Sequence, residues 1–312
     1  MPVRRRRATH AGSWYDASPE KLRKSLTAWL QQPSCTPSSS NRSVTHAVIA
    51  PHAGFSYSAS TAAHAYAAID PRKFSRVIVL GPSHHVYMKD TCALSDAHLL
   101  ETPLGDLPVD RDVVEGLLSS EHRHTRFITM NTYNDEAEHS IEMHLPFIRL
   151  VFAARDVNVV PIVVGSLSEE KERAFGSVLS SWIGDGETFF IVSSDFCHWG
   201  SRFGYTRVDH QSEHIWQSIE KLDRQGMRCI ESGDHASFWA YQRHTENTVC
   251  GRHPIGVLMS ALAHCSHHSN RVFETRFVRY KQSSRCMSMS DSSVSYASAV
   301  IQTTSNDDET GN

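Results

Sequence analysis

The sequence predicts a single-domain α/β protein with a mostly parallel central sheet flanked by helices. Short apolar runs rich in β-branched residues, at residues 44–50, 76–80 and 188–192, are typical of buried strands. Segments with helical patterning lie between them, as parallel strands require. Each run ends in a cluster of His, Asp or Cys, and ligands of such sheets gather beyond the carboxyl ends of the strands. We therefore expect one shared polar pocket, with metal chemistry as its leading explanation.

The other elements follow from capping residues, apolar spacing and alternation. Ser18 and Pro19 are a capping residue and a first-turn proline, so a helix is expected to begin there. Pro161 predicts that its strand is bulged or at an edge. Further helices are expected at residues 59–68, 110–118, 140–152, 169–183, 208–224, 236–243 and 254–264, and further strands at 157–165, 271–278 and 294–301.

No internal repeat or interdomain linker is apparent, so residues 1–302 are expected to form one domain. Residues 1–8 include four consecutive arginines, which could be a nuclear signal or an anion contact, although a flexible solvated arm is the simpler interpretation. Residues 33–43 are rich in Ser and Pro and predict a surface loop. Residues 303–312 predict a disordered polar tail.

The composition argues against nucleic-acid-binding and membrane proteins. The 312 residues carry a formal net charge of −3, without the basic excess typical of nucleic-acid or membrane-surface proteins. No apolar stretch approaches the ~20 residues of a membrane span, so no membrane insertion is expected. Seven scattered cysteines, without a CxxC pair or a signal peptide, indicate free thiols in the cytoplasm, with a nuclear location left open.

Histidines follow the first two strands. His52 lies between Pro51 and a small Ala-Gly pair, where it could point into the pocket or cap a helix. His84 and His85 follow a turn after the second strand. Adjacent residues of an extended chain point to opposite sides, so we expect only one of these two to bind a given metal. The residues alone do not say which.

The third strand is followed by Asp195, Cys197 and His198. Asp195 and His198 are three residues apart and share a face if this segment is helical. The carboxylate could bind a metal, orient an imidazole or act as a base. Cys197 is a candidate ligand, although an inert buried thiol is the commoner role.

Two more clusters lie outside the strand ends. Residues 138–144 contain His139 and His144 without the HExxH order, which excludes a zinc protease and leaves hydrogen bonding to ligands, substrate binding or a surface cluster. Cys250 is close to Arg252 and His253, and is either a ligand or redox thiol or a buried cysteine in a turn before a helix. Phosphate-binding loops and the GxSxG nucleophile motif are absent from the sequence.

The clusters resemble those of the Memo family, cytosolic proteins named as mediators of receptor-tyrosine-kinase-driven cell motility. The resemblance extends in order over nearly the whole chain and departs at the basic start, the Ser-rich loop and the polar tail. The matching segments are HAGSWY (10–15), APHAG (50–54), LGPSHHV (80–86), EHSIEMHLP (138–146), VSSDFCHWG (192–200), CGRHPIGVL (250–258) and DSSVSYA (291–297).

The resemblance implies a fold like that of the class III extradiol dioxygenases, which bind non-haem iron through two His and one carboxylate. The Memo family has a Cys in place of the acidic ligand. By this resemblance His52, His84 and Cys250 would hold iron or copper. Asp195 and His198 would lie near these ligands and act as catalytic residues. The surrounding pocket would include His85, His139, His144, Arg252 and His253.

Three functions follow from the resemblance. The first is a metal-dependent redox protein of signalling and motility that generates reactive oxygen species. The second is an adaptor that binds phosphotyrosine peptides of receptors, with Arg252 and imidazoles as the phosphate contacts. The third is a catechol dioxygenase, ranked last because a thiolate is softer than a carboxylate and a fold does not imply a function. Whether the chain is an enzyme, a non-haem metal oxidoreductase, stays open at this point.

Overall fold

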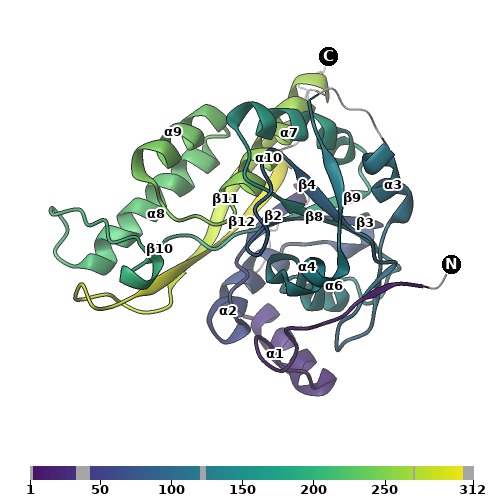
Figure 1. Ribbon diagram of the computed structural model, residues 1–312, viewed down its shortest axis with the longest axis horizontal. Coiled ribbons are helices and arrows are strands. Elements are labelled where there is room, and N and C mark those ends of the chain that lie inside the picture. The colour runs from purple at the N-terminus through teal and green to yellow at the C-terminus, as the bar shows by residue number, and fades with distance from the viewer. Residues whose placement is uncertain (1–2, 33–42, 120–123, 270, 305–312) are drawn as a thin grey trace, which may run out of the picture.

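The computed structural model describes residues 3–32, 43–119, 124–269 and 271–304 (Figure 1). Its main feature is a nine-stranded sheet with the order β10-β12-β2-β9-β3-β8-β4-β7, in which β11 pairs with β12. A small three-stranded sheet has the order β1-β5-β6. The strands are β1 (Arg5–Arg6), β2 (Val44–Ala50), β3 (Arg76–Pro82), β4 (Cys92–Ser95), β5 (Leu99–Leu100), β6 (Leu107–Pro108), β7 (Phe127–Met130), β8 (Asn158–Val164), β9 (Thr188–Ser193), β10 (His198–Trp199), β11 (Val272–Gln282) and β12 (Ser293–Thr304).

The centre of the large sheet is parallel. Strands β2, β9, β3 and β8 are successive parallel neighbours, whereas β12 and β4 join this block antiparallel on its two sides. The α/β prediction is therefore confirmed, with a mixed sheet that is largely parallel. Ala50 of β2 pairs with Ser193 of β9, and Leu80 of β3 pairs with Val192 of β9, so the three strand ends lie side by side.

Helices flank the sheet and pack in pairs. Helix α7 packs along α10, α1 on α2, and α8 on α9. Figure 1 shows α8 and α9 beside the β11–β12 hairpin, apart from α1 and α2. The helices are α1 (Pro19–Leu30), α2 (Phe55–Tyr66), α3 (Arg111–Ser119), α4 (Thr132–Ala137), α5 (His139–Glu142), α6 (Leu145–Val151), α7 (Glu169–Gly184), α8 (Ile215–Glu231), α9 (His235–Thr245) and α10 (Arg252–Ser269), with 3₁₀ turns at Pro71–Lys73 and Ser201–Phe203.

Local sequence signals explain several boundaries. The Ser18 side chain accepts a hydrogen bond from the backbone N–H of Lys21 and caps α1, as predicted. The helix expected over 140–152 is two short helices, with Pro146 in the first turn of α6. The expectation of an edge or bulged strand at Pro161 is wrong, because β8 lies between β3 and β4. The β4 ladder pairs only residues 162–164 of β8, so the proline lies outside it.

The prediction of a flexible arm over residues 1–8 is wrong for residues 3–8. Residues Arg5–Arg6 form β1 beside β5, and Arg6 is 1% exposed. Its guanidinium pairs with Glu142 at 2.7 Å and with Asp135 at 3.1 Å. The arginines are ordered because acidic residues far along the chain neutralise them.

Parts of the other predictions fall outside the described residues. The Ser/Pro-rich loop is described only at residue 43, and the polar tail only at Thr303 and Thr304, which belong to β12. Within the described ranges, every helix is too short or too polar to cross a membrane.

Candidate metal centre

His52 follows the end of β2 and is 2% exposed. The Ser193 hydroxyl donates to the carbonyl of Ser140 at 2.7 Å, and it lies 2.6 Å from His52 Nδ1. Because its only proton is used, Ser193 Oγ accepts from His52 Nδ1–H. The lone pair of His52 is therefore on Nε2, the atom that faces Cys250 Sγ at 3.2 Å. The hydroxyl fixes the tautomer that a metal ligand needs.

His84 lies in the turn after β3 and is oriented by Glu138. Its backbone N–H donates to Glu138 Oε2 at 2.6 Å, and its Nδ1 lies 2.8 Å from Glu138 Oε1. Burial would raise the pKa of Glu138, but the hydrogen bonds that this carboxylate accepts from the ring and backbone N–H of His84, and from the backbone N–H of Ser140, outweigh burial and lower the pKa to about 2. An ionised carboxylate only accepts, so His84 Nδ1 carries the proton and Nε2 is free for a metal.

Cys250 lies in the turn before α10. Its Sγ accepts a hydrogen bond from the backbone N–H of Asp195 at 3.3 Å. Burial raises the pKa of the thiol, and the charge of Asp195 raises it further, so a metal must displace its proton to bind. A Cβ at Gly251 would collide with the Ser194 side chain and the Ser193 carbonyl, so glycine permits this close approach.

These three side chains converge. Ligand atoms of His52, His84 and Cys250 all lie within 4.8 Å of one another, as do those of a second group, His84, Glu138 and His139. The first group fits a metal better, because the Glu138 carboxylate is occupied by hydrogen bonds to His84. Two neutral imidazole nitrogens and one sulfur suit iron, copper or zinc and are poor ligands for magnesium or calcium.

The two residues expected to serve the chemistry lie beside this cluster. Asp195 Oδ1 accepts from the backbone N–H of His52 at 2.9 Å, and burial raises the pKa of this 3%-exposed carboxyl. Asp195 is outside both ligand groups, so it positions the backbone at His52. His198 Nδ1 lies 2.9 Å from the carbonyl of Phe196 and 3.1 Å from that of Thr248, so Nδ1 carries a proton and donates to these carbonyls.

Of the other expected pocket residues, His139 is closest to the cluster. Its ring stacks on His84 with centroids 4.3 Å apart and lies tilted against Trp14 with centroids 4.5 Å apart. Burial, followed by the charge of His84, lowers the pKa of His139 to about 3. The exposed ring of His85 lies 6.2 Å from that of His139. His144 is in the core, where its Nδ1 lies 2.8 Å from the Tyr66 hydroxyl.

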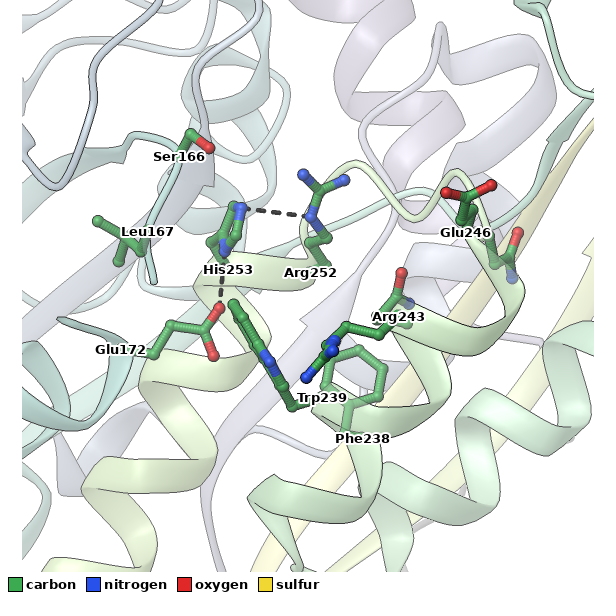
Figure 2. A pocket seen from close by; sticks show the side chains of 11 residues that line it. Ser166, Leu167, Glu172, Phe238, Trp239, Arg243, Glu246, Arg252 and His253 are labelled. Atoms are coloured by element: carbon green, nitrogen blue, oxygen red, sulfur yellow. Dashed lines mark hydrogen bonds and ion pairs between the residues drawn. The ribbon is translucent and has the colours of Figure 1, made fainter. Parts of the chain in front are cut away.

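Arg252 and His253 face a different cavity. Figure 2 shows them at the start of α10 with Glu172, Trp239 and other residues around a cavity of about 390 Å³. None of the three candidate ligands lines it. The sequence placed both residues near Cys250, but they are the first two residues of α10, and the helix presents them to the side of α7 and α9.

Sequence reasoning missed Ser193, Glu172 and His235. Ser193 could have been found only from the pairing of β2 with β9, which places it opposite Ala50. Glu172 and His235 meet at 2.6 Å across a separation of 63 residues, with no motif to signal it.

Comparisons with known proteins point to one family over nearly the whole chain. Residues 6–300 match the family described as Memo-like protein. The chain is 46% identical over 299 residues to Protein MEMO1 of Xenopus laevis, and 44% identical over 299 residues to Protein MEMO1 of Homo sapiens, covering 95% of this chain and 97% of each relative. It is 41% identical to the memo-1 homolog of Caenorhabditis elegans, covering 95% of this chain and 82% of that protein.

Among solved structures, the uncharacterized protein JW3007 of Escherichia coli K12 superposes with a TM-score of 0.46 and 9% identity. The superposition covers 82% of this chain and 99% of that one.

Proposed function

Because this chain belongs to the Memo family, we propose that it is a redox protein in which His52, His84 and Cys250 hold one iron or copper ion. By the family resemblance, the proposal places it in the cytoplasm, in receptor-tyrosine-kinase signalling and cell motility, with a fold like that of the class III extradiol dioxygenases. Bound iron or copper would supply electron transfer to dioxygen.

The main support for this proposal is that the possible metal-ligand atoms of these three residues lie close together. Their ligand atoms lie within 4.8 Å of one another, although they come from the segments after β2 and β3 and from the turn before α10. Ser193 and Glu138 hold the protons of both imidazoles on Nδ1, so each Nε2 is free. A sulfur donor favours iron or copper over the hard cations that a carboxylate would attract.

The neighbouring side chains would assist the centre. Asp195 keeps the backbone at His52 in place, and its own backbone N–H stabilises the sulfur of Cys250. His198 Nδ1 is held by two backbone carbonyls, so Nε2 is the ring nitrogen available for proton transfer at this half-buried position. We propose Asp195 as a positioning residue and His198 as the residue that moves protons.

Metal analysis tests the proposal. Protein purified without chelators is expected to contain iron or copper equimolar with the chain, and Cys250→Ser, His52→Ala and His84→Ala are expected to lose most of it. Cys265→Ser is the matched control, since Cys265 is a buried thiol on α10 away from the cluster. Circular dichroism establishes that each variant is folded. Unchanged metal content in the three ligand variants would contradict the proposal.

An adaptor for phosphotyrosine peptides is the second proposal. It is favoured by the exposed rim of the same centre, where Trp14 is 37% exposed and its ring contacts that of His139. Arg252, the expected phosphate contact, lines the other cavity, so imidazoles would have to bind the phosphate. A catechol dioxygenase ranks last, because Cys250 replaces the carboxylate ligand of such enzymes.

A further inference from the structure

The cavity at the start of α10 has the size of a small-molecule site. It lies between the loop after β8, α7, α9 and α10, and its volume of about 390 Å³ falls in the range of roughly 300–1,000 Å³ for ligand pockets. Leu167, Phe238 and Trp239 give it an apolar wall, and the exposed Arg243 and Arg252 also line it (Figure 2).

Both arginines are exposed and, among the described residues, neither forms an ion pair. The Arg252 Nε–H donates to His253 Nε2 at 3.2 Å, which leaves the terminal guanidinium nitrogens available. Gln242 also lines the cavity at 9% exposure, and its Nε2 has no hydrogen-bond partner in the described part of the chain. The donors that the cavity offers to a ligand beside its apolar wall are therefore those of the two exposed arginines, whereas Gln242 Nε2 is buried.

The inner end of the cavity is uncharged. Because His253 Nε2 accepts from Arg252, its proton is on Nδ1, which donates to Glu172 Oε1 at 2.6 Å. The other oxygen of Glu172 lies 2.6 Å from His235 Nε2. Burial raises the pKa of Glu172 to about 9 and lowers that of His253 to about 3, so both are neutral at pH 7.

The remaining charged side chains of the cavity determine which net charge of a ligand they can balance. Glu246 is the exposed carboxylate of the lining, so two arginines and one carboxylate leave a single net positive charge. A guanidinium binds a carboxylate through two parallel hydrogen bonds. A monoanion balances this charge, whereas a phosphate dianion would exceed it.

We propose that this cavity binds a small organic monocarboxylate, with its carboxylate on Arg243 and Arg252 and a flat apolar group against Trp239. The site is separate from the metal centre and does not depend on the function proposed for that centre.

Calorimetric titration of the full-length protein with benzoate, benzamide and phenyl phosphate tests the assignment. Benzoate is expected to bind about tenfold more tightly than neutral benzamide, because only the carboxylate forms charge-assisted hydrogen bonds with the guanidinium groups. Arg243→Gln is expected to weaken benzoate binding by a similar factor. Arg228→Gln, an exposed arginine of α8 outside the cavity, is the matched control and should leave binding unchanged.

The titrations would overturn the proposal if they showed no binding at millimolar benzoate, equal affinity for benzoate and benzamide, unchanged affinity in Arg243→Gln, or tighter binding of phenyl phosphate than of benzoate. Repeating the titration after removal of metal by a chelator separates the two sites. Unchanged benzoate affinity supports the separate cavity, and loss of binding would move the ligand to the metal centre and contradict the assignment.

Discussion

Two buried glutamates, Glu138 and Glu172, each lie against two histidine rings, yet their acidities move in opposite directions. Glu138 lies 2.8 Å from His84 Nδ1 and 3.7 Å from His139 Nδ1, and its pKa falls to about 2. Glu172 lies 2.6 Å from both of its imidazoles, and its pKa rises to about 9. Residue type and proximity therefore do not determine the charge state.

The two pKa values differ because Glu138 accepts hydrogen bonds from backbone N–H groups and Glu172 does not have these donors among its described contacts. Glu138 accepts two backbone N–H bonds, from His84 at 2.6 Å and from Ser140 at 2.9 Å, in addition to the imidazole of His84. Backbone amides cannot surrender their protons, so they stabilise the ionised carboxylate. Glu172 meets neutral rings, and burial dominates its titration. The ionised carboxylate of Glu138 orients the candidate metal ligand His84. The neutral carboxyl group of Glu172 links α7 to α9 and α10 through the rings of His235 and His253.

The largest expected effect is that of Glu138→Gln on metal binding. The amide lacks the negative charge, and its NH₂ group would face an N–H donor, so His84 would lose its orientation. Loss of such a ligand-orienting partner typically lowers metal affinity about 10–100-fold. Competition with a chelator measures the change, and Glu172→Gln serves as the control without loss of affinity. Equal affinities in the two variants would remove the distinction between the two glutamates.

A smaller effect is expected for Glu172→Gln on the pH dependence of stability. The folded pKa of about 9 exceeds the ordinary 4.5, so at intermediate pH the folded protein keeps a proton that the unfolded chain has released. Stability conferred by that proton therefore decreases as pH rises through this window. Glutamine is always neutral and can accept from His253 while donating to His235, so the variant should lose less stability between pH 7 and pH 9.

Urea unfolding of the wild-type protein and of Glu172→Gln at both pH values measures this slope. If the free energy of unfolding decreased equally in the wild-type protein and in Glu172→Gln between the two pH values, Glu172 would be ionised in the folded protein. That result would contradict the contrast drawn between Glu138 and Glu172.

The same contrast shows what the sequence could predict. Strand composition and capping residues located β2, β3, β9 and α1, because these signals are local. The choice between His84 and His85 was not local: it depends on Glu138, which holds His84 across 54 residues. His85 stays exposed at the rim.

The two main errors concern arginines whose surroundings are not set by their neighbours in the sequence. The basic start was expected to be solvated, but Arg6 reaches acidic groups more than 100 residues away in the chain. Arg252 was assigned to the pocket of Cys250 because it is two residues distant, and the first turn of α10 directs it to another cavity. Spacing along the chain predicts neither the acidic partners of Arg6 nor the cavity that Arg252 lines.

The central claim is that two imidazoles and one thiolate bind a common ion. X-ray absorption at the edge of the bound metal tests it most directly. The account predicts one sulfur and two imidazole nitrogens in the first coordination shell, with loss of the sulfur contribution in any metal that Cys250→Ser retains. A shell containing only nitrogen and oxygen in the wild-type protein would contradict the claim.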